Sequence, residues 1–139
     1  MHALSRTLLR AAALCACATA PWMAQAQTPV VAPAMKVQDA GRYVCGGVGS
    51  DESEAMRAAM KDHPLSLLFA RASGAYLADV DVMVKDDKGG TALAMRASGP
   101  VCLVDLPAGR YTVEAASEGV TKSQAVTLGS GSKTADFRF

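Results

Sequence analysis

The sequence predicts an all-β fold, an antiparallel β-sandwich of about seven strands with one short accessory helix. Three observations support this fold class. From Leu65 onward, apolar residues recur at every second position, as in the run of Val80, Val82 and Val84, which is the period of strands with one face in a core and the other in water. Turn residues, chiefly glycine, proline and aspartate, interrupt the pattern about every 8–12 residues. The chain of 139 residues also has the length of a single domain.

The amino-terminal segment has the features of a secretory signal peptide. Residues 1–26 begin with a basic region that contains Arg6 and Arg10, continue with an apolar stretch, and end in a small-x-small triplet at Ala26. The apolar stretch is shorter than the roughly 20 residues that span a bilayer. We therefore expect cleavage after Ala26 and a periplasmic or secreted protein. Lipoprotein processing at Cys17 is the less favoured alternative, because few residues separate Arg10 from Cys17.

Removal of this segment leaves residues 27–139, with 12 basic and 13 acidic side chains and a net charge of −1. This near-neutral net charge excludes a nucleic-acid-binding protein, which would have a strongly basic surface. No later segment is long and apolar enough to cross a membrane. Cys45 and Cys102 are the cysteines that remain, and disulfides persist in an oxidising compartment. They could form one disulfide; two free, buried thiols are the alternative.

The elements are expected in the following order. Residues 27–41 form an extended leader without a clear period, and residues 42–45 form the first strand. A short helix follows over residues 51–61, because acidic residues occupy its first turn, basic residues lie towards its end, and Pro64 stops it. The later strands span 65–70, 79–85, 91–97, 101–106, 110–116, 120–128 and 133–139.

One turn carries a family signature. Leu106, Pro107, Gly109, Tyr111 and Val113 resemble the L-P-x-G-x-Y-x-V motif of carboxypeptidase regulatory-like domains and their collagen-adhesin B-type relatives. That resemblance implies a transthyretin-like sandwich domain over 42–139, in which the leucine and the tyrosine of the turn point into the core. The loop over residues 46–49, the acidic start of the helix and residues 73–80 resemble those of small secreted proteobacterial proteins that carry this domain alone and have no assigned activity.

The resemblance also bears on the cysteines. In such domains the residues three and five positions before the turn leucine face inward, and these are Leu103 and Val101 in this chain. That pattern places Cys102 on the outer face of the sheet. Cys45 could still meet it there if the first strand covers that face, so the disulfide stays an open alternative.

The residues that could carry chemistry are few. His63 is the only histidine after residue 26, and a hydrolytic triad needs a histidine beside a nucleophile. The transthyretin-like hydroxyisourate hydrolases rely on several histidines and a carboxy-terminal Tyr-Arg-Gly-Ser, which this chain lacks. Asp79, Asp81, Asp86 and Asp87 fit solvent-facing and turn positions better than a calcium site. The sequence therefore predicts no catalytic residue, no metal site and no cofactor.

The predicted function is that of a non-enzymatic module in the cell envelope, with a structural or interaction role towards an envelope protein or a glycan. A small-ligand or carbohydrate-binding domain is the alternative. An exposed cluster around Tyr43 or Tyr76 beside polar loops would favour ligand binding, whereas a long uncovered strand edge would favour a protein partner.

Overall fold

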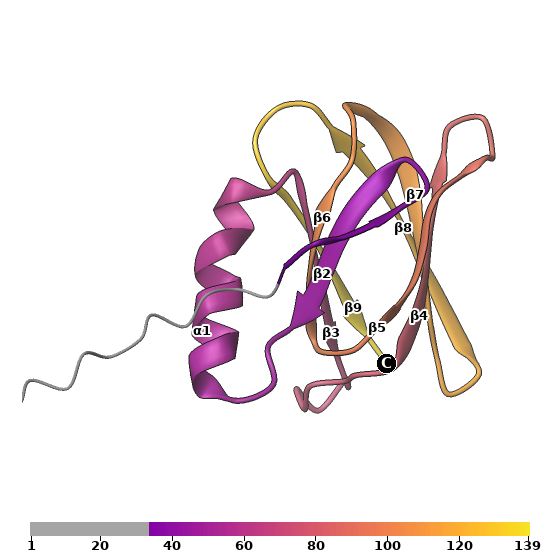
Figure 1. The fold of residues 1–139 in the computed structure, drawn as a ribbon. Coiled ribbons are helices and arrows are strands. Elements are labelled where there is room, and N and C mark those ends of the chain that lie inside the picture. Colours follow the sequence, from indigo (N-terminus) through magenta and orange to yellow (C-terminus); the bar gives the residue numbers. More distant parts are fainter. Residues whose placement is uncertain (1–33) are drawn as a thin grey trace, which may run out of the picture.

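The computed structural model describes residues 34–139, which fold into two β-sheets packed face to face, with one helix against the outside (Figure 1). The expected signal peptide, its cleavage point after Ala26 and Cys17 lie outside the described residues. One sheet has five strands in the order β1-β2-β6-β3-β9, and the other has four in the order β5-β4-β7-β8. The elements are β1 Lys36–Gln38, β2 Gly41–Gly46, α1 Ser50–Ala59, a 3-10 turn Met60–Asp62, β3 Leu65–Ala70, β4 Val80–Asp86, β5 Thr91–Ala97, β6 Val101–Asp105, β7 Gly109–Ser117, β8 Val120–Leu128 and β9 Lys133–Arg138.

The predicted all-β sandwich with a single short helix is confirmed, with two differences in detail. The pairing is antiparallel except between β3 and β9, which run parallel along their whole lengths. After β8, the chain crosses from the four-stranded sheet to the five-stranded sheet. There β9 pairs with the free edge of β3 and runs in the same direction. The second difference is β1, which pairs with β2 in the last part of the expected 27–41 leader. That part of the leader therefore belongs to the sheet.

The core between the sheets comes from the alternating pattern of the strands. Val80, Val82 and Val84 of β4 are buried, while the residues between them face solvent or are partly covered. Across from them, Phe69 of β3 and Phe137 of β9 stack with their ring centres 5.8 Å apart. Burial of these large apolar side chains is the main force that holds the two sheets together.

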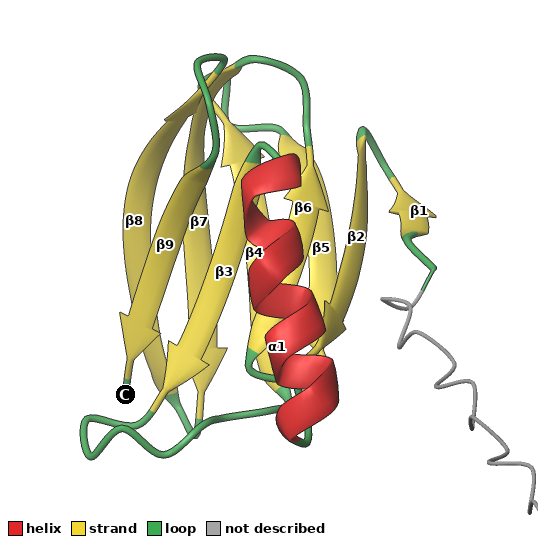
Figure 2. Ribbon diagram, turned by 90° about the vertical axis from the view of Figure 1, so that its left-hand side faces the viewer, coloured by secondary structure: helices red, strands yellow, loops and turns green. Residues whose placement is uncertain are grey.

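Helix α1 lies against the outer face of the five-stranded sheet, in front of β3 and β6 (Figure 2). Its buried residue is Met56, which packs on Val44, Val101 and Leu103. The helix begins after Gly49, whose φ of 87° is a left-handed conformation that glycine adopts without strain. Because the helix covers one face and the second sheet the other, β6 is buried on both sides.

The signature turn has the expected inward-facing side chains. Leu106, Tyr111 and Val113 are buried, and the Tyr111 hydroxyl donates a hydrogen bond of 2.8 Å to the carbonyl oxygen of Pro107. This bond ties the start of β7 to the turn before it. Burial raises the pKa of the Tyr111 hydroxyl above its usual value, and the nearby Asp86 and Asp87 add to the shift.

Cys45 and Cys102 form a disulfide between neighbouring strands, where they are direct partners in the β2–β6 register. The expected orientation of β6 is wrong, however. Cys102 lies in the core between the sheets, whereas Val101 and Leu103 face helix α1. Both faces of β6 are apolar because both are covered, so the residue pattern alone did not distinguish them. The two cysteines meet on the inner face of the sheet.

Candidate functional site

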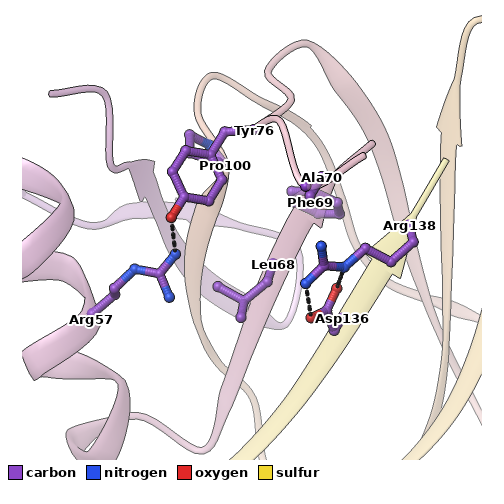
Figure 3. A pocket seen from close by; sticks show the side chains of 9 residues that line it. Arg57, Leu68, Phe69, Ala70, Tyr76, Pro100, Asp136 and Arg138 are labelled. Atoms are coloured by element: carbon purple, nitrogen blue, oxygen red, sulfur yellow. Dashed lines mark hydrogen bonds and ion pairs between the residues drawn. The ribbon is translucent and has the colours of Figure 1, made fainter. Parts of the chain in front are cut away.

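A polar hollow lies between helix α1 and strand β9, at the end of β3 (Figure 3). Its volume is about 370 Å³, within the range of about 300–1,000 Å³ found for small-molecule sites. Arg57 stands on the helix side and Arg138 on the β9 side, with Leu68 between them and Tyr76 above (Figure 3). We call this hollow the α1–β9 groove.

Arg57 and Tyr76 form the helix-side wall of the groove. Arg57 lies in the last turn of α1 and donates a hydrogen bond of 2.9 Å from Nη2 to the Tyr76 hydroxyl oxygen. Its guanidinium carbon is 5.5 Å from the centre of the Tyr76 ring, close enough for a cation–π interaction. Tyr76 follows the turn after β3, where it bridges back to Ala70, and the residue remains 61% exposed.

Asp136 and Arg138 form the opposite wall. They lie two residues apart on β9, so both point to the outer face while Ala135 and Phe137 point into the core. Arg138 donates from Nε and Nη2 to the two carboxylate oxygens of Asp136, at 2.9 and 3.1 Å. This fork-shaped pair raises the pKa of Arg138 further above its usual value, which keeps the guanidinium charged.

A second hollow, of about 470 Å³, adjoins the first on the side of Gly47 and Gly49, in the loop before α1. It shares Arg57 and Tyr76 with the α1–β9 groove and adds Ser53 and Glu54 from the first half of the helix. The Arg57–Tyr76 pair therefore stands between two depressions, where a ligand longer than one ring could contact both.

His63 forms a separate polar cluster near the start of β3. Its Nδ1 lies 2.6 Å from an Asp105 carboxylate oxygen, and Arg42 donates to the other oxygen at 3.1 Å. A histidine beside a carboxylate is two thirds of a hydrolytic triad. In the described part of the chain, no serine, threonine or cysteine side chain forms a hydrogen bond with His63. The cluster links the segment after α1 to the end of β6.

The aspartates considered for calcium have protein partners instead. Asp79 and Asp81 both approach Arg96, at 3.5 and 3.3 Å. Asp86 accepts hydrogen bonds from the backbone N–H groups of Lys88 and Gly90, which closes the turn between β4 and β5. Within residues 34–139, no group of three or more acidic, histidine or cysteine residues is arranged to hold a metal ion.

Of the two tyrosines considered as ligand-binding candidates, Tyr76 lies in the groove and Tyr43 does not. Tyr43 is half-buried in β2 and packs against the core. The sequence indicates Arg57 only as a basic residue near the end of a predicted helix. The sequence indicates nothing about Asp136 and Arg138 beyond their place on an outer face of the sheet. That place follows from their alternation with the apolar Ala135 and Phe137.

No helix within residues 34–139 is both long enough and apolar enough to cross a bilayer. No protein-family model matches the chain, and no curated protein matches it either.

Proposed function

We propose that the chain is an exported, non-enzymatic β-sandwich module of the carboxypeptidase regulatory-like type that binds a glycan of the cell envelope in the α1–β9 groove. The observation that carries this proposal is the exposed Tyr76 ring, held at the rim of a polar hollow by Arg57. Exposed aromatic rings are suited to pack against the C–H faces of sugars, and the charged groups around Tyr76 can hydrogen-bond to hydroxyls.

The disulfide and the signature turn support export and the family. A disulfide such as Cys45–Cys102 is stable in an oxidising compartment and uncommon in the cytosol. The buried Leu106 and Tyr111 sit as the resemblance to carboxypeptidase regulatory-like domains implies. Together with the signal-like residues 1–26, these features favour periplasmic or secreted localisation.

The geometry around His63 favours a structural role over catalysis. The carboxylate of Asp105 is already shared with Arg42, and no nucleophile of the described chain is hydrogen-bonded to the imidazole. A histidine base acts by taking a proton from a group within hydrogen-bond reach. The cluster instead stabilises the connection from α1 to β3.

A protein partner that docks on the β8 edge is the second candidate function. Strand β8 is nine residues long and pairs with β7 on one side, which favours this reading. However, the exposed Lys122 of β8 places its ammonium group over the Phe139 ring, 6.0 Å from the ring centre, and lysines on an edge strand are a common protection against edge pairing. Gln124 also donates to the Asp136 carbonyl oxygen and joins β8 to β9. The groove is therefore the better-supported site.

The test is binding to a panel of immobilised neutral and acidic envelope polysaccharides, with protein purified after export of the full chain. We expect a subset of glycans to retain the protein, and we expect Tyr76→Ala to weaken that binding about tenfold or more, the scale of one lost aromatic contact at a binding hot spot. Val37→Ala, an exposed apolar residue on β1, is the matched control and should bind normally.

Both variants change exposed side chains, so their melting temperatures should stay close to that of the unmodified protein. Equal retention of the Tyr76→Ala variant would contradict the proposed site. Failure of every polysaccharide to retain the protein would contradict glycan binding and turn attention to the β8 edge.

A further inference from the structure

We propose that the α1–β9 groove selects ligands that carry an oxyanion, a carboxylate or a phosphate, on a small hydroxylated ring. This inference rests on the proposed glycan-binding function and specifies the chemistry of the ligand. Three features of the groove carry it: a cation without an acidic partner, a hydroxyl with a free hydrogen beside that cation, and a carboxylate on the opposite wall.

The cation is Arg57. Among the described residues it forms no salt bridge, and its one hydrogen bond goes to a neutral phenol oxygen, that of Tyr76. Residues 1–33 contain no aspartate or glutamate that could serve as its partner. Its guanidinium has five N–H donors in a planar fork, which matches the oxygen spacing of a carboxylate or a phosphate. Most of these donors are therefore available to a ligand.

The second donor is the Tyr76 hydroxyl. Its oxygen accepts the hydrogen bond from Arg57, so the hydroxyl hydrogen is left to donate elsewhere. In the described part of the chain no residue accepts it. An oxyanion beside Arg57 would receive this hydrogen together with guanidinium N–H groups. Hydrogen bonds from charged donors to charged acceptors are about twice as strong as those between neutral groups.

Asp136 and Arg138, on the opposite wall, determine the net charge of the groove and the contacts available to hydroxyl groups of a ligand. Arg138 is paired with Asp136, so the groove as a whole carries one excess positive charge, from Arg57. The Asp136 carboxylate keeps lone pairs that can accept hydrogen bonds from ligand hydroxyls, while Leu68 and Pro100 supply an apolar surface between the walls. Glu54 lines the neighbouring hollow, where its negative charge offsets the positive charge of Arg57. The α1–β9 groove is therefore the more positive of the two hollows.

The experiment compares three ligands with the same ring and different charge: D-glucuronate, D-glucose 6-phosphate and D-glucose. Each is titrated at low salt into the isotope-labelled protein, and amide and arginine Nε–H signals are followed by NMR. We expect at least one anion to bind about tenfold more tightly than glucose, with shifts centred on Tyr76 and the Arg57 side chain. The tighter of the two anions identifies carboxylate or phosphate as the recognised group.

Substitutions at Arg57 separate the contribution of its positive charge to anion binding from that of its planar guanidinium group. Arg57→Gln should remove the tenfold preference for the anion, and Arg57→Lys should keep part of it, because lysine retains the charge but loses the planar fork. Arg96→Gln is the matched control: Arg96 is an exposed arginine of β5 outside the groove, and its removal should change the anion affinity less than about twofold.

Three results would overturn the inference: glucose binding as tightly as both anions, an unchanged preference in Arg57→Gln, or no shift at Tyr76 with any of the three ligands. Failure of the inference and of the proposed function are distinguishable. Retention on neutral polysaccharides that depends on Tyr76 would leave the function intact while the oxyanion preference fails.

Discussion

Replacing both Cys45 and Cys102 by alanine is expected to lower the free energy of unfolding by about 4 kcal/mol. The disulfide closes a loop of 57 residues, which spans the helix and strands β3 to β5. Cross-linking a loop of that length restricts the unfolded chain, and the stabilisation grows with the logarithm of the loop length. For a domain of this size, such a loss is a large part of a total stability of about 5–15 kcal/mol.

Urea unfolding measured with and without a reducing agent tests this prediction. The unmodified protein should lose stability when reduced, and the double-alanine variant should be insensitive to the reductant. The variant is its own control for side reactions, because it contains no cysteine after residue 26. An unmodified protein whose urea midpoint does not change on reduction would contradict the stabilising role of the Cys45–Cys102 bond.

Phe137→Ala is expected to cost about 3–5 kcal/mol. Phe137 is 1% exposed, stacks on Phe69 and belongs to β9, which β3 holds in parallel pairing. Truncation removes buried apolar surface of the Phe137 side chain and leaves a cavity between the two sheets that the surrounding side chains fill only in part. Thermal and urea unfolding of the variant measure the loss.

Two neighbouring substitutions are matched controls for Phe137→Ala. Phe139→Ala, at a half-buried ring directly after the same strand, should cost clearly less. Ser66→Ala, on β3, should leave stability unchanged or raise it, because the Ser66 oxygen is fully buried and no described residue hydrogen-bonds to it. Equal losses for Phe137→Ala and Phe139→Ala would contradict the burial of Phe137 between the two sheets.

The sequence predicted the sandwich because its strands alternate clearly. Val80, Val82 and Val84 show why: one face is apolar and the other polar, so the period both identifies the strand and orients it. Strand β6 shows the opposite case, since Val101 to Val104 are all buried and the period cannot tell one covered face from the other. The parallel β3–β9 pair joins segments far apart in the chain, which no local pattern reveals.

The groove was predictable only in part. Tyr76 was identifiable as an aromatic residue among turn residues, and Arg57 as a basic residue near a helix end. Their proximity depends on the packing of α1 on the outer face of the five-stranded sheet, and the presence of Asp136 and Arg138 depends on the pairing of β9 with β3. These are consequences of the tertiary arrangement, which brings β9, far along the chain, beside α1 and the segment that follows β3.

Mass spectrometry of the intact protein, purified from cells that make the full chain, tests the claim that this chain is an exported and disulfide-bonded module. We predict an amino terminus at Gln27 and a mass lower by two hydrogens than that of the reduced form, with one peptide pair linked through Cys45 and Cys102. A protein that retains Met1 and has two free thiols at these positions would contradict the claim.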